Sequence, residues 1–150
     1  NSEGNLPWAT LGIPDGDPWG NRYRYRVTPA FANSVTFFTV TTAGDSTVCT
    51  AAAAVCAAQL ATSVAAVVVN HGKNGRGAFN MQGTQNPLPP VADTDERSNA
   101  FNTTTPTGQR GYVSHTAVGI GGAGGEFDDQ LNWLSPGILV SRMVQAGRLP

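Results

Sequence analysis

Three carboxylates stand close together near the end of the chain, in the stretch EFDDQLNW that contains Glu126, Asp128 and Asp129. A glycine-rich connector, GIGGAGG, directly precedes them. Carboxylates and loop carbonyl oxygens are the ligands that hard cations such as calcium prefer. The spacing does not match the calcium loop of EF-hand proteins, so the alternative is that these carboxylates cap a helix or pair with arginines. Calcium is the only cofactor that this stretch suggests.

The two histidines, His71 and His115, could form a hydrolytic or metal site with Asp128 or Asp129, because such sites depend on geometry rather than on order in the chain. The sequence contains neither a G-x-S-x-G nucleophile motif nor an H-E-x-x-H zinc motif. Histidines are ordinarily surface residues or hydrogen-bonded loop residues. We therefore expect no enzyme, and a periplasmic hydrolase that uses His71 or His115 is a third-ranked alternative.

The stretch HGKNGRGA, residues 71–78, has clustered glycines whose backbone N–H groups could cradle a phosphate. It lacks the G-x-x-x-x-G-K-[ST] order, and no strong helix pattern follows it. The stretch therefore predicts a turn after a strand rather than a nucleotide site.

Arginines at positions 22, 24 and 26 alternate with Tyr23 and Tyr25, which resembles a strip for binding nucleic acid. A period of two places the two residue types on opposite faces of a strand, so one face cannot supply both. The net charge is −1, with nine basic and ten acidic residues, and is too weak to recruit polyanions. We expect a buried aromatic face, solvated arginines and no nucleic acid partner.

Two cysteines, Cys49 and Cys56, are seven positions apart in CTAAAAVC. This spacing matches neither a metal motif nor a C-x-x-C redox motif, so a short structural disulfide is the natural interpretation. Along a helix the two Cα atoms would be about 10 Å apart, beyond the roughly 7 Å limit for a disulfide, so residues 51–55 must turn. The alternative is two buried free thiols in an alanine-rich helix.

The elements that must position these residues are short. The 150 residues fit one domain, and a charged fraction of 13% with 18 glycines and 10 prolines favours strands and loops over long helices. Residue patterns predict an antiparallel hairpin at 21–27 and 34–42, strands at 65–70 and 112–114, irregular chain over most of 71–111, and a helix from Ser135–Pro136 to Gly147. We predict an α+β fold with a small antiparallel β-sheet, long loops and a C-terminal helix packed against the sheet.

The stretch DPWGNRYRY resembles the D-P-W-G-N-x-Y-x-Y turn and strand of type II secretion pseudopilins and related type IV pilin-like proteins. The residues that carry this resemblance are Asp17, Pro18, Trp19, Gly20, Asn21, Tyr23 and Tyr25. Two further stretches, VVVNHGKNGRGA and EFDDQLNW, resemble the family's strand with its glycine-rich loop and its acidic stretch near the C-terminus. The resemblance implies that residues 1–150 form a single pilin-like head, in which the first motif is an architectural turn and strand with Trp19 packed beneath it.

Pilin-like proteins are structural subunits of a pilus or pseudopilus that assemble through an apolar N-terminal helix, which also anchors them in the inner membrane. The sequence begins at Asn1 without such a helix, so we expect it to represent the head alone. The resemblance implies other pilin or pseudopilin subunits and the inner membrane as partners, and the periplasm or cell surface as the location, which suits a disulfide. It also implies calcium at Asp128 and Asp129, which match the calcium-binding stretch of the major pseudopilin.

A long segment separates HGKNGRGA from Asp128, where the major pseudopilin has only a few residues. This difference suggests a minor pilin or a pilin-like protein of an envelope apparatus. The alternative class is a secreted or periplasmic binding module whose glycine-rich loops take a small ligand or a glycan.

Overall fold

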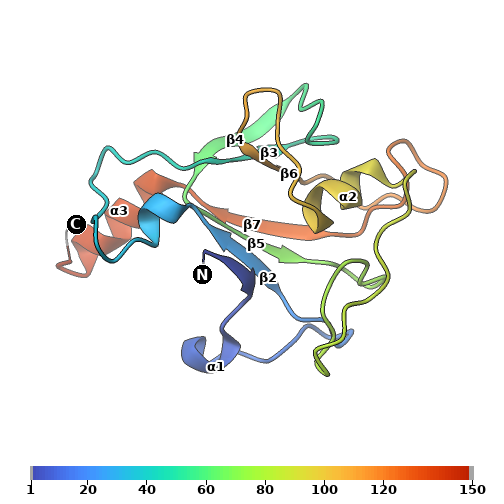
Figure 1. Cartoon of the computed structure of the whole chain (residues 1–150), viewed down its shortest axis with the longest axis horizontal. Coiled ribbons are helices and arrows are strands. Elements are labelled where there is room, and N and C mark those ends of the chain that lie inside the picture. The colour runs from blue at the N-terminus through green and yellow to red at the C-terminus, as the bar shows by residue number, and fades with distance from the viewer. Residues whose placement is uncertain (1, 149–150) are drawn as a thin grey trace.

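The computed structural model describes residues 2–148, and it confirms the predicted α+β fold with a C-terminal helix (Figure 1). It has two small β-sheets where the sequence predicted one. The strands are β1 (Glu3–Asn5), β2 (Arg24–Val27), β3 (Ser46–Cys49), β4 (Gln59–Val64), β5 (Ala66–Asn70), β6 (Arg110–Val113) and β7 (Gln130–Leu134). The helices are α1 (Trp8–Leu11), α2 (Thr94–Ala100) and α3 (Pro136–Gln145), with a short 3-10 helix, η1 (Pro29–Phe31). None of the helices among residues 2–148 has the length and apolar character needed to cross a membrane.

The larger sheet has four antiparallel strands in the order β1-β2-β5-β7. Its interior strands are β2 and β5, and the β-branched run AVVVN of β5 alternates between buried and half-buried positions. Val67 and Val69 are 1% exposed and face the core, whereas Ala66 and Val68 point to the opposite face. The strand predicted at 65–70 is therefore confirmed.

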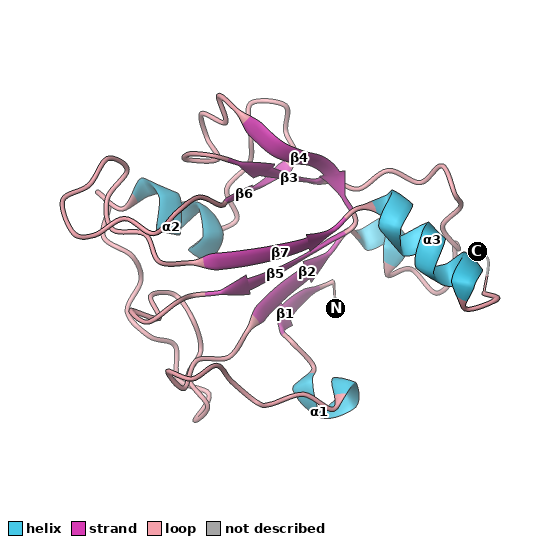
Figure 2. Cartoon of the chain, turned by 180° about the vertical axis from the view of Figure 1, so that it is seen from behind, coloured by secondary structure: helices cyan, strands magenta, loops and turns pink. Residues whose placement is uncertain are grey.

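The smaller sheet has the order β4-β3-β6, and β3 runs parallel to β6 although sixty residues separate them in the chain. The apolar core lies between the two sheets and joins residues of both. Its buried members are Val48, Val64, Val67, Val69 and Tyr112. The strand predicted at 112–114 overlaps β6 at Tyr112 and Val113. Figure 2 shows the two sheets from behind.

The predicted orientation of the arginine strip is wrong. Arg24 and Arg26 lie directly opposite Val69 and Val67 in the sheet, so they point toward the core side. They are tolerated there because acceptors surround them: Arg24 donates to the carboxylate of Glu3 and Arg26 to that of Asp45. The Arg26 guanidinium in turn holds the pKa of Asp45 below its usual value. The tyrosines, half-buried, occupy the other face.

The predicted strand at 34–42 does not form. Neither edge of β2 is open to a strand from residues 34–42, because β1 pairs with one edge of β2 and β5 pairs with the other. The segment is instead an exposed loop whose backbone bonds are local, such as those that Val35 N and Thr36 N donate to Asn33 Oδ1. High β-propensity alone does not make a strand when no partner edge is open.

The C-terminal helix is confirmed as α3, and Ser135 caps it by accepting a hydrogen bond from Ile138 N at 3.3 Å. None of its residues is buried, and it extends from the end of β7 (Figure 2). The helix therefore covers less of the sheet than predicted.

Candidate functional site

Three carboxylates from distant parts of the chain meet at one point. Asp128 and Asp129 lie directly before β7, and Glu96 comes from the buried side of α2. One carboxylate oxygen from each of the three lies within 4.8 Å of the others, a spacing at which the three could hold a metal ion. The structure thus brings the predicted pair together and adds a third acid that sequence reasoning did not identify.

Each of these carboxylates has one oxygen held by an amide donor. Glu96 Oε1 accepts from Asn74 Nδ2 at 2.6 Å, and Asp128 Oδ2 accepts from Asn74 N at 2.9 Å. Asp129 Oδ2 accepts from Asn99 Nδ2 at 2.9 Å. Such outer contacts fix the orientation of carboxylates in the way that supporting residues do around bound metals.

The second oxygen of each carboxylate is buried and has no hydrogen-bond partner among residues 2–148; these atoms are Glu96 Oε2, Asp128 Oδ1 and Asp129 Oδ1. Two cationic or basic groups approach them at longer range: Arg76 Nη1 is 3.8 Å from Glu96 Oε2, and His71 Nδ1 is 3.5 Å from Asp129 Oδ1. Arg76 lies closer to Asp93 and Glu126, at 2.5 and 2.9 Å, so it chiefly neutralises those two. Three oriented but unsatisfied oxygens form a donor set that suits a hard cation.

The pKa of Glu96 is raised from 4.5 to about 7, chiefly by burial and also by the neighbouring carboxylates of Asp129 and Asp128. The hydrogen bond from Asn74 acts in the opposite direction because it favours the ionised form. Glu96 is 1% exposed, so water cannot compensate its charge. A bound cation would favour the ionised form of Glu96 and offset the cost of burying its charge.

A glycine is required where the chain after β5 passes this site. Gly72 has a φ of +59°, and a Cβ built there would lie 2.4 Å from both the carbonyl oxygen and Oδ1 of Asp128. Any side chain would push the two segments apart. The glycine in the first turn of HGKNGRGA therefore allows Asp128 to pack directly against the backbone.

The remainder of that stretch does not offer a phosphate cradle. The backbone N–H groups from Asn74 to Ala78 all donate to protein acceptors, including Asp128 Oδ2, His71 O and Pro87 O. These hydrogen bonds form a turn after β5.

The two histidines face different acids. His71 is 1% exposed and lies beside Asp129, whereas His115 Nε2 lies 3.0 Å from Asp95 Oδ2 and its ring stacks on Phe127. The two histidines therefore do not form one site with Asp128 or Asp129. His71 lies beside Asp129, and His115 lies beside Asp95.

The motif DPWGN forms a tight corner before β2. Asp17 is 7% exposed, and its Oδ1 accepts hydrogen bonds from Trp19 N at 2.9 Å and from Asn21 N at 2.8 Å. Pro18 lies at the surface of this turn, and Gly20 takes a φ of +83° that suits glycine. Residues 17–21 thus form a turn.

Asn21 connects this corner to two other segments. Its Nδ2 donates to Gly72 O at 3.3 Å, and its Oδ1 accepts from Asn86 Nδ2 at 2.8 Å. Trp19, by contrast, is 46% exposed, so the expectation that it packs beneath the turn is wrong. The turn is held by polar contacts of Asp17 and Asn21 rather than by the indole.

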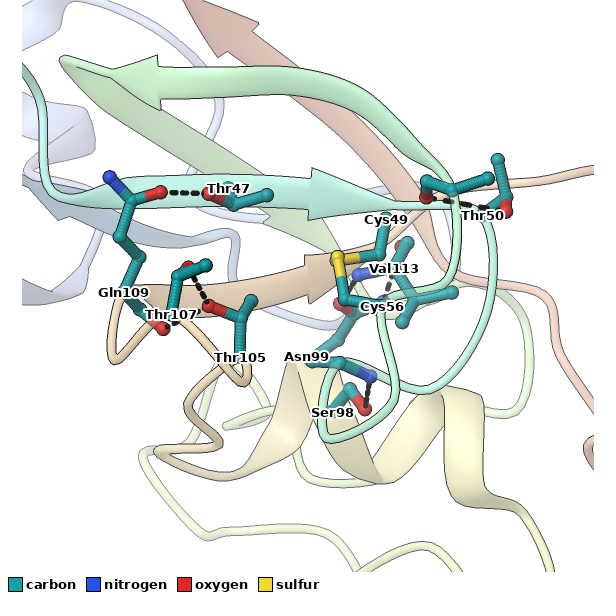
Figure 3. Close-up of a disulfide and its surroundings, with 12 residues drawn as sticks. Thr47, Cys49, Thr50, Cys56, Ser98, Asn99, Thr105, Thr107, Gln109 and Val113 are labelled. Atoms are coloured by element: carbon teal, nitrogen blue, oxygen red, sulfur yellow. Dashed lines mark hydrogen bonds between the residues drawn. A yellow bond between two sulfur atoms is a disulfide. The ribbon is translucent and has the colours of Figure 1, made fainter.

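The disulfide between Cys49 and Cys56 is confirmed, with a Cα–Cα distance of 5.2 Å (Figure 3). The intervening chain turns as expected, because Val55 N and Cys56 N both donate to Ala52 O. Ser98 Oγ of α2 accepts from Ala53 N at 2.9 Å and ties the loop to that helix. A disulfide indicates an oxidising, extracytoplasmic environment.

Comparisons with protein-family models, curated proteins and solved structures found no match to this chain. The assignment to pilin-like proteins therefore depends on the motifs and stays a prediction.

Proposed function

We propose that this chain is the head domain of a structural subunit of a pilus or pseudopilus, of the type IV pilin-like or type II secretion-like class. The observation that carries the proposal is the role of the DPWGN motif. Its residues Asp17 and Asn21 build the corner that connects the start of β2 with the chain at Gly72 and Asn86. Asp17 and Asn21, two of the residues that carry the resemblance, thus have a structural role, and this role supports the proposal.

The outer face of the larger sheet supports the same proposal. Tyr25 lies opposite Val68, and Val27 lies opposite Ala66, which in turn faces Leu134. All five are half-buried on the face away from the core. An apolar helix of the intact subunit would cover this strip, and the same helix would supply the contacts with the inner membrane and with neighbouring subunits.

The location follows from the same proposal. The disulfide supports an oxidising compartment, and we assign the chain to the cell envelope, in the periplasm or at the cell surface. The acidic site then has calcium as its proposed ion, held by Asp128, Asp129 and the newly identified Glu96, because oxygen donors suit this cation.

Thiol labelling in cells tests the proposed subunit. A Val68→Cys variant of the complete gene product is compared with the purified 150-residue chain, using a membrane-permeant maleimide and mass spectrometry of sheared surface and envelope fractions. Position 68 is expected to react in the purified chain and to be protected in the fraction that contains filaments. A Val91→Cys variant, at a position that is 80% exposed, is the matched control and should react in both.

Recovery of the chain only as a freely soluble protein, with position 68 equally reactive everywhere, would contradict the filament role. That outcome would favour the alternative of a binding module for a small ligand or glycan. A cavity of about 260 Å³, lined by residues that include Arg24, His71 and Phe79, is where such a ligand would be sought.

A further inference from the structure

One end of the molecule exposes apolar side chains from two separate segments. The loop that follows η1 and the helix α3 lie at this end in both views, and α2 lies at the opposite end (Figures 1 and 2). We call residues 29–44 together with α3 the apolar end. Its most exposed apolar residues are Val35 at 86%, Phe37 at 78%, Val40 at 62%, and Ile138 and Val144 at 54% each.

The charges of the apolar end have a single sign. Residues 27–44 contain no charged side chain, and residues 130–148 contain only Arg142 and Arg148, both exposed. Six of the ten acidic residues gather near the other end of β7 and around α2: Asp93, Asp95, Glu96, Glu126, Asp128 and Asp129. Arg76 and Arg97 offset part of the negative charge around α2. At the α3 end, Arg142 and Arg148 leave a small positive charge, because the neighbouring Asp45 is paired with Arg26.

We propose that the apolar end docks on an anionic lipid surface. Helix α3 carries one basic residue, Arg142, and exposes the aliphatic side chains of Ile138 and Val144, and Arg148 follows the helix. Exposed aliphatic side chains beside basic ones are features of helices that lie in a membrane interface. The loop adds Phe37 and Val35 beside it, and the two arginines complement anionic headgroups. This docking goes beyond the proposed head function and does not require a filament.

A lipid surface fits these observations better than a protein partner does. The five apolar side chains come from a loop and a helix, and the part of the loop around Val35 makes local hydrogen bonds such as those to Asn33. A bilayer accepts scattered apolar side chains without a matching pocket and offers negative charge at every position. A protein would have to place its own carboxylates opposite Arg142 and Arg148.

Vesicle flotation of the 150-residue chain tests the proposal. The probes are vesicles of phosphatidylcholine alone and vesicles that also contain phosphatidylglycerol, at low and at high salt. Binding is expected only to the anionic vesicles, and high salt should weaken it because it screens the arginines. The double variant Arg142→Gln/Arg148→Gln should bind about 30-fold more weakly, since each basic residue near an anionic surface contributes about fivefold.

A Val35→Ser/Phe37→Ser variant is expected to lose at least about tenfold in binding because it removes apolar insertion. The matched control is Val91→Ser/Ile120→Ser, which changes residues that are 80% and 88% exposed outside the apolar end and should bind like the parent. Circular dichroism checks that every variant folds.

Absence of binding to anionic vesicles, or equal losses in the control variant, would overturn the proposal. Analytical ultracentrifugation provides the other decisive result. If the parent chain self-associates without lipid, and the Val35→Ser/Phe37→Ser variant is monomeric, the apolar end is a protein interface and the lipid proposal fails.

Discussion

Glu96 is a carboxylate in a place that disfavours its charge. It is 1% exposed, and its Oε2 has no hydrogen-bond partner in the described part of the chain. The nearest cation, the guanidinium of Arg76, lies 3.8 Å away and has closer partners in Asp93 and Glu126. Without a bound cation, ionisation of Glu96 must therefore cost folding free energy.

The sign of the resulting pH dependence follows from the pKa of Glu96, which burial raises to about 7 from 4.5. The folded state then holds this proton more tightly than the unfolded state does. As pH rises from about 4.5 to 7, the contribution of this group to stability falls by about 3 kcal/mol, and it stays low above that range.

We expect the metal-free Glu96→Gln variant to lack this decline, because glutamine carries no charge at any pH. The measurement is the free energy of unfolding in urea, at a series of pH values with chelator present. Asp15→Asn, which changes an acid paired with Arg22 at the surface, should keep the decline of the parent. An identical pH profile in Glu96→Gln and the parent would show that Glu96 does not carry this penalty.

At the scale of elements, the corner before β2 depends on one carboxylate. Asp17 Oδ1 accepts from both Trp19 N and Asn21 N, and no backbone acceptor replaces it in the turn. Asp17→Ala should lower the free energy of unfolding by about 1–3 kcal/mol, because the buried N–H of Asn21 and the partly buried N–H of Trp19 lose their acceptor. Asp17→Asn keeps an oxygen at the same place and should retain most of the stability.

Urea denaturation of the two variants measures this difference. Pro18→Ala, at the exposed position of the same turn, is the control and should change stability by much less. Equal stability of Asp17→Ala and the parent would mean that the corner is held by contacts other than this carboxylate.

Elements with strong local signals could be predicted from the sequence, and elements defined by distant partners could not. Strand β5 has a continuous β-branched run, and α3 has a cap and an apolar stripe. Strand β3 has four residues and pairs in parallel with β6, so nothing local marks it. Helix α2, with the sequence TDERSNA, buries polar and charged side chains, so it lacks the apolar period by which a helix is detected.

The same limit applies to the acidic site. Asp128 and Asp129 were found because they are adjacent and follow a glycine-rich connector. Glu96 and Asn74 lie far from Asp128 and Asp129 in the sequence. Only the folding of α2 and of the chain after β5 brings the four residues together. The arginines of β2 were assigned to solvent because their partners, Glu3 and Asp45, are likewise distant in the sequence.

At the scale of the whole molecule, the acidic site closes one of the two long stretches of chain that separate paired strands. Strands β5 and β7 pair directly, yet residues 71–129 lie between them in the chain. Asn74 and His71 come from the start of this stretch, Glu96 from its middle and Asp128 from its end. A cation bound there would fasten all three parts to the sheet, and this fastening should appear in global stability.

We therefore expect calcium to raise the melting temperature of the chain and a chelator to reverse the rise. At one hundred times the dissociation constant, a ligand that binds only the native state adds about 2.7 kcal/mol, or about 5–10 °C for a chain of this size. Glu96→Gln/Asp128→Asn should abolish the calcium-induced shift, while Asp15→Asn should keep it. Differential scanning calorimetry measures these shifts, and a melting temperature that calcium leaves unchanged in the parent would exclude the ion as a structural ligand. In that case the buried carboxylates would have to be balanced by Arg76, and Arg76→Gln would become the more destabilising change.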